Sequence, residues 1–93
     1  MTSQLRDEIL ASIAGVRSVA RAEDDTARES AAGWLDGLFA DVTTRRELRT
    51  AAHQALTLWG GAGSFSDVGT PESAAAVDRL RTALRRARSR LVR

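Results

Sequence analysis

The 93-residue chain contains no cysteine, no lysine and no tyrosine, and it has a single proline and a single histidine. Without cysteine it can form neither a disulfide framework nor a thiolate metal site. No apolar run approaches the roughly 18 residues needed to span a bilayer. Acidic residues at positions 7 and 8 stand where a signal peptide would carry its apolar stretch. We therefore expect a cytoplasmic protein without a transmembrane segment.

All fourteen basic residues are arginine, and seventeen residues are alanine. This bias is typical of a GC-rich bacterial genome, so an arginine here can stand where another genome encodes lysine. Leucine, isoleucine, valine and phenylalanine together supply only 20 residues, which is slightly above the composition of disordered chains. The low net charge of +2 argues against disorder. We expect one domain over residues 1–93 with a thin core, which self-association would thicken.

Apolar residues spaced three and four apart predict four helices, over about residues 3–21, 26–40, 44–59 and 71–92. The inner stripe of the first helix follows steps of four, four, three and four: Leu5, Ile9, Ile13, Val16 and Ala20. No segment shows the alternating pattern of a strand. The connections are short apart from a glycine loop over residues 60–69, so the sequence predicts an all-α fold, a compact four-helix bundle.

Three of the predicted helices begin with a capping signal. Thr26 is followed three residues later by Glu29, and Thr44 is followed in the same way by Glu47. This spacing is that of a capping box, in which each side chain bonds the backbone of the other residue. Thr70 precedes a proline, which favours the first position of a helix.

The same spacing predicts which residues the later helices bury. The second helix is expected to bury one face of alanine, leucine and tryptophan, with a phenylalanine at its edge: Ala27, Ala31, Trp34, Leu35, Leu38 and Phe39. The stripe of the third helix is Leu48, Ala52, Ala55 and Trp59. That of the fourth is Val77, Leu80, Leu84 and Leu91. Both tryptophans are expected to be core anchors, and an exposed one would instead indicate a partner surface, because tryptophan is enriched in binding hot spots.

Charge is divided unevenly along the chain. Residues 79–93 contain seven arginines and no acid, whereas residues 1–78 contain seven arginines and twelve acids. The seven arginines occupy the arc of the last helix opposite its buried stripe: Arg79, Arg81, Arg85, Arg86, Arg88, Arg90 and Arg93. A solvated face, with some arginines paired to acids such as Glu23, Asp24 and Asp25, is the plainest interpretation.

The arginine face is also a candidate for binding phosphates or an acidic protein, because guanidinium groups hold phosphate through two hydrogen bonds. The last helix has no asparagine, glutamine or aromatic residue that would read or stack on bases. Any nucleic-acid binding by this helix would therefore be independent of sequence.

Within the glycine loop, residues 60–67 read Gly-Gly-Ala-Gly-Ser-Phe-Ser-Asp. Phosphate-binding glycine loops follow a strand, whereas this one follows a helix. Together with Trp59, the segment resembles the Gly-Gly-Met-Gly-Ser-Phe-Asn-Asp segment of a family of small, uncharacterised bacterial helical proteins, with Ala62 and Ser66 in place of Met and Asn. The resemblance implies a shared loop conformation and no activity. Its candidate residues are Gly61, Gly63, Ser64, Phe65 and Asp67.

Residues that carry chemistry are sparse. His53, the only histidine, lies off the predicted buried stripe, and no carboxylates are spaced around it as metal ligands would be. A nucleophile at Ser64 or Ser66 would need a base beside it, and His53 is separated from both by the end of the helix. Asp24 and Asp25 lack the alternating oxygen ligands of a calcium loop. We therefore expect no enzyme activity, no metal and no cofactor.

By elimination, the sequence favours a small non-enzymatic protein-interaction module. It would be a homodimer, or a regulatory or neutralising partner of another bacterial protein. The alternative is a sequence-independent nucleic-acid-binding protein that uses the arginine helix. A membrane-surface role is not expected, because the last helix has no tryptophan or phenylalanine to enter the interface.

Overall fold

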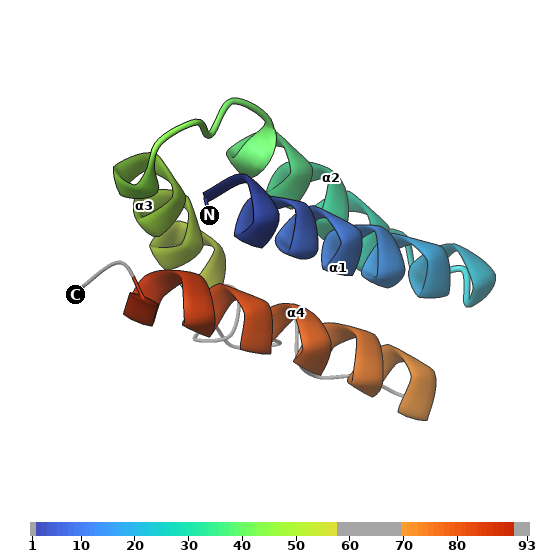
Figure 1. Ribbon diagram of the computed structural model, residues 1–93. Helices are drawn as coiled ribbons and strands as arrows, with labels where there is room; N and C mark the ends of the chain where they lie inside the picture. The colour runs from blue at the N-terminus through green and yellow to red at the C-terminus, as the bar shows by residue number, and fades with distance from the viewer. Residues whose placement is uncertain (1, 58–69, 91–93) are drawn as a thin grey trace.

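The computed structural model describes residues 2–57 and 70–90, and their side chains over residues 4–57 and 70–88. The described residues form no strand, and the chain is a four-helix bundle (Figure 1), which confirms the predicted all-α fold. The helices are α1 (Thr2–Ala22), α2 (Thr26–Ala40), α3 (Arg45–Leu56) and α4 (Pro71–Arg90). The described part of α3 ends at Leu56, and residues 58 and 59 of the predicted helix lie outside the described residues.

α1 is the central helix of the bundle and lies between α2 and α4 (Figure 1). Both neighbours run antiparallel to α1 and pack extensively against it, and among the described residues they do not contact each other. α3 is the shortest of the four; it packs mainly against α4 and only lightly against α2. This light packing of α3 on α2 leaves a groove between the two helices.

The stripe predicted for α1 is buried at all five positions. On α3 and α4, every predicted inner residue with a described side chain is buried as well: Leu48, Ala52, Ala55, Val77, Leu80 and Leu84. Trp59 and Leu91 lie outside the described residues. The sequence did not indicate two buried serines, Ser12 and Ser73, each of which has a hydrogen-bond acceptor.

The inner face predicted for α2 is correct at Leu35, but the helix is rotated so that Phe39, expected only at the edge, is fully buried. The buried residues are Ala32, Leu35 and Phe39. Ala31 and Leu38 are half-buried, whereas Ala27 and Trp34 are exposed. Phe39 and Trp34 are five residues apart, which places them about 140° apart around a helix. A single packed face therefore accommodates only one of the two rings, and α2 turns Phe39 into the core.

The capping box predicted for the start of α2 is also wrong. The N-terminal cap is Asp25, whose side chain accepts a hydrogen bond from the amide of Arg28 at 3.1 Å. Aspartate is a stronger cap than threonine, so Asp25 takes the position expected for Thr26. Glu29, the expected second member of the box, instead accepts a hydrogen bond from Arg21 of α1 at 2.7 Å.

The start of α4 is held to the end of α1 by the carboxylate of Glu23. Thr70 caps α4 as predicted, because its hydroxyl oxygen accepts a hydrogen bond from the amide of Ser73 at 3.0 Å. The same hydroxyl donates to one oxygen of Glu23 at 2.5 Å, and the hydroxyl of Ser73 donates to the other at 3.0 Å. Glu23 therefore binds two hydroxyl groups rather than an arginine of α4.

Candidate functional site

Five of the seven predicted arginines of the last helix have described side chains: Arg79, Arg81, Arg85, Arg86 and Arg88. Arg81 is half-buried and the other four are exposed. The side chain of Arg90 and the whole of Arg93 lie outside the described residues.

These arginines are divided between two sides of α4. At about 100° per residue, three of them fall within roughly 60° of one another, and we call this group the arginine flank: Arg81, Arg85 and Arg88. Arg79 lies about 160° from Arg81 around the helix, on the same side as Arg86. The sequence predicted a single arginine face, but these side chains form two groups on α4. The arginine flank is one group, and the group with Arg79 and Arg86 adjoins α1.

Arg86 is the member of this set that forms an ion pair. Its Nη1 donates to both carboxylate oxygens of Glu8 on α1, at 3.1 Å each. An α4 arginine therefore does bind an acid of the body, but that acid is Glu8 and not one of the three predicted, Glu23, Asp24 and Asp25. Arg81, Arg85 and Arg88 form no ion pair with any other described residue.

The outward side of α2 carries no charged side chain. Each charged residue within the helix is half-buried and ion-paired: Arg28 with Asp25, Glu29 with Arg21, and Asp36 with Arg17. The exposed positions hold small or uncharged residues and one large aromatic: Thr26, Ala27, Ser30, Gly33, Trp34, Gly37 and Ala40. Trp34 is 47% exposed and is the only large hydrophobic side chain exposed to this extent within the described residues.

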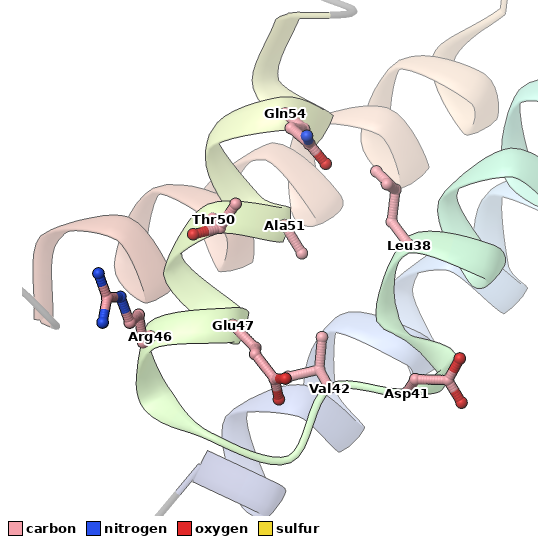
Figure 2. Close-up of a pocket in the computed structure, with 8 residues that line it drawn as sticks. All are labelled: Leu38, Asp41, Val42, Arg46, Glu47, Thr50, Ala51 and Gln54. Carbon is pink, nitrogen blue, oxygen red and sulfur yellow. The ribbon is translucent and has the colours of Figure 1, made fainter.

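A groove of about 410 Å³ lies beside this helix, between the end of α2 and α3 (Figure 2). Its lining residues are Leu38, Asp41, Val42, Arg46, Glu47, Thr50, Ala51 and Gln54. Leu38, Val42 and Ala51 supply its apolar surface. Trp34 lies four residues before Leu38, so the two side chains are neighbours on the same side of α2. The apolar surface of the groove thus continues along α2 to Trp34.

Two carboxylates lie at the end of the groove where α2 and α3 are joined (Figure 2). Oε1 of Glu47 accepts hydrogen bonds from the amides of Thr43 and Thr44, at 2.9 and 3.2 Å, and from the hydroxyl of Thr43 at 3.0 Å. These bonds, led by that from the Thr43 amide, lower the pKa of Glu47, so the carboxylate is charged at neutral pH. With the amide of Glu47 bonded to the Thr44 hydroxyl at 3.1 Å, they complete the predicted capping box of α3. Asp41 is exposed and forms no ion pair with a described residue.

Arg6 of α1 fixes the position of the turn at this end of the groove. Its Nη1 donates to the backbone carbonyl of Val42 at 2.9 Å. Val42 is buried, so this bond joins the central helix to a residue that also lines the groove. No local pattern in the sequence indicates this contact, because 36 residues separate its partners.

The described residues were also searched for a histidine site, a metal site and a membrane-spanning helix. His53 is exposed, as expected. Over residues 4–57 and 70–88, no three acidic or histidine side chains gather closely enough to hold a metal ion. None of the helices, over the same part of the chain, is both long and apolar enough to cross a membrane.

The glycine loop and its candidate residues, Gly61, Gly63, Ser64, Phe65 and Asp67, lie outside the described residues. Comparison with protein-family models, with curated proteins and with solved structures gives no match for this chain. The resemblance of residues 59–67 to a bacterial family therefore stays a prediction. The function must therefore be inferred from the exposed surfaces of α2, α3 and α4.

Proposed function

We propose that this chain is a small non-enzymatic protein-interaction module, acting as a homodimer or as a regulatory or neutralising partner of another bacterial protein. The interaction takes place at the Trp34 surface, which comprises Trp34, Leu38 and the groove between α2 and α3. The observation that carries the proposal is the 47% exposure of Trp34 on a helix whose outward side has no charge.

Burial of this tryptophan against a partner would contribute substantial binding energy. A tryptophan has up to about 250 Å² of surface to bury, so the exposed half corresponds to roughly 100 Å². At about 25 cal/mol per Å², covering that area stabilises a complex by about 2.5 kcal/mol. Charged residues are depleted at the cores of protein interfaces, and the uncharged side of α2 has this composition.

Site-specific photo-crosslinking in cells tests the proposal. A benzophenone amino acid at Gln54 lies in the groove, and one at Thr82 lies on the exposed side of α4. We expect a discrete crosslinked species from position 54 that disappears in the Trp34→Ala background, and none from position 82. The same products from both positions, or products at position 54 that are insensitive to Trp34→Ala, would contradict the proposal.

A second candidate function is sequence-independent binding of nucleic acid by the arginine flank. The supporting observation is that Arg81, Arg85 and Arg88 share one side of α4 and form no ion pair with another described residue. Three adjacent guanidinium groups can contact successive phosphates, and each neutralised phosphate releases counterions.

Fluorescence anisotropy with a labelled random duplex and a labelled single strand, over several salt concentrations, tests this second function. Replacing Arg81, Arg85 and Arg88 by glutamine is expected to weaken binding and to reduce the salt slope by about one unit per arginine. The matched control removes the same charge from α3 through Arg45→Gln, Arg46→Gln and Arg49→Gln. No binding near physiological salt, or equal losses in both triple variants, would rule out the arginine flank as the site.

A further inference from the structure

We propose that the groove between α2 and α3 is filled by Trp34 of a second copy of this chain. Two copies then exchange their tryptophans across a two-fold axis, so that each groove is complete only in the dimer. This inference rests on the proposed function, and it identifies the partner as the chain itself.

One surface of the chain carries both halves of the proposed contact. In a two-fold symmetric dimer the same patch meets itself, so it must supply both a projecting group and the hollow that receives it. Trp34 and the groove residue Leu38 lie one helical turn apart on the same side of α2. A two-fold axis passing between them brings each tryptophan over the groove of the other copy.

The groove has a size and a composition that suit a tryptophan side chain. Its volume of about 410 Å³ falls within the range of about 300–1,000 Å³ that is typical of sites for small organic groups. One indole ring is a group of this kind, and Leu38, Val42 and Ala51 offer it apolar contacts. The groove therefore accepts a single tryptophan side chain.

The end of the groove offers hydrogen-bond acceptors to an indole N–H. The indole Nε1–H is a donor that requires an acceptor when it is buried. Asp41 has no ion pair with a described residue, and all the hydrogen bonds recorded for the Glu47 carboxylate go to its Oε1. Both carboxylates thus offer a charged acceptor to the positive edge of an indole ring.

The outward side of α2 also presents neither like charges nor bulky side chains, apart from Trp34, that would keep two copies apart. Within Thr26–Ala40 its outward side has no charged residue, so two such helix faces meet without repulsion between like charges, and the carboxylates of Asp41 and Glu47 lie beyond them at the groove end. Gly33 and Gly37 are exposed beside Trp34, and a Cβ at either would meet nothing within 4 Å. Small residues at these positions let a second helix come close.

Light scattering and sedimentation equilibrium of the full chain test the proposal through two variants that fail in different ways. Trp34→Ala keeps the groove but removes the side chain that fills it. Thr50→Arg keeps the tryptophan but blocks the groove, because it replaces a small lining residue of α3 with a long charged side chain that takes up space in the groove. We expect the wild-type chain to be a reversible dimer and each variant to dimerise at least about tenfold more weakly.

Mixing the two variants provides the decisive result. A heterodimer of Trp34→Ala and Thr50→Arg contains one intact contact, the tryptophan of the second in the open groove of the first. Either homodimer of these variants contains none. We therefore expect the mixture to form more dimer than either variant alone at the same total concentration. Tryptophans that stacked on each other would give no such recovery, because the mixed pair has only one.

Asp78→Ala, on the exposed side of α4, is the control and is expected to dimerise as the wild type does. Circular dichroism and thermal unfolding establish that each variant is folded before its assembly is compared. A wild-type chain that stays monomeric at high concentration, or a mixture without recovery, would overturn the inference. If Trp34-dependent crosslinks to another protein nevertheless persist in cells, the proposed function stands and only the identity of the partner is wrong.

Discussion

The carboxylate of Glu23, at the end of α1, accepts a hydrogen bond at 3.0 Å from the hydroxyl of Ser73, which is only 3% exposed near the start of α4. The two residues are 50 positions apart in the chain. This contact and the bond from Thr70 hold the first turn of α4 against the central helix.

Glu23→Ala is expected to lower the free energy of unfolding by about 1–3 kcal/mol, because it leaves the buried hydroxyl of Ser73 without its acceptor. Urea denaturation at neutral pH measures the change. Asp7→Ala, which removes an exposed carboxylate with no ion pair among the described residues, is the matched control and should have a much smaller effect. Equal losses in the two variants would show that Glu23 does not hold α4 in this way.

The pair between Arg86 and Glu8 is expected to contribute far less. Both side chains are well exposed, at 50% and 42%, so water and salt screen their attraction. A double-mutant cycle with Arg86→Ala and Glu8→Ala should give a coupling energy of about 0.2–1 kcal/mol that falls as salt is added. A larger, salt-independent coupling would mean that the pair is buried in solution.

The free energy of unfolding is expected to fall in acid, because the carboxylates that cap α2 and α3 become protonated. Hydrogen bonds from Thr43 and Thr44 lower the pKa of Glu47, and the Arg28 side chain and amide lower that of Asp25. Since each pKa is lower in the folded than in the unfolded chain, the stabilisation is present above the ordinary values of 4.5 and 3.8 and is lost as the pH falls through the folded pKa.

Glu47→Gln and Asp25→Asn are therefore expected to be less stable than the wild type at neutral pH and to lose less stability in acid. Urea unfolding at neutral pH and at several acidic values measures both effects. Curves that stay parallel to the wild type at every pH would contradict this assignment of the caps.

Gly15→Ala is expected to stabilise the protein by about 1 kcal/mol, because glycine in a helix interior leaves the unfolded chain more conformational freedom to lose. Gly15 is half-buried within α1, and an added Cβ would meet nothing within 4 Å. Thermal unfolding followed by circular dichroism measures the gain. A loss of stability would show that α1 and its neighbours are packed more tightly at this point.

Local signals in the sequence predicted much of the fold. The five-residue stripe of α1 was correct because it lies on the central helix, where neighbours on both sides bury it. The Thr44–Glu47 box was correct because its partners are three residues apart, so the interaction depends on local geometry alone. The start of α4 at Pro71 followed from the preceding Thr70 for the same reason.

The Trp34 surface could not be predicted, because it depends on tertiary packing. Periodicity placed Trp34 on the buried face of α2 and Phe39 at its edge, whereas the packing of α2 in the bundle buries Phe39 and leaves Trp34 exposed. The groove likewise depends on how lightly α3 packs on α2, which no local pattern encodes. One signal was available in the sequence. Small uncharged residues recur along one side of α2, from Ala27 to Ala40, where an exposed helix normally carries charge.

In the proposed dimer, Trp34 of one copy occupies the groove of another. A ¹⁵N-labelled sample observed by NMR at increasing protein concentration tests it most directly. We predict that the indole N–H resonance of Trp34 and the amides of Leu38, Thr50 and Gln54 shift together with concentration, while the amides of Arg81 and Arg85 stay constant. A spectrum that does not change with concentration, or shifts centred on α4 instead, would contradict the claim.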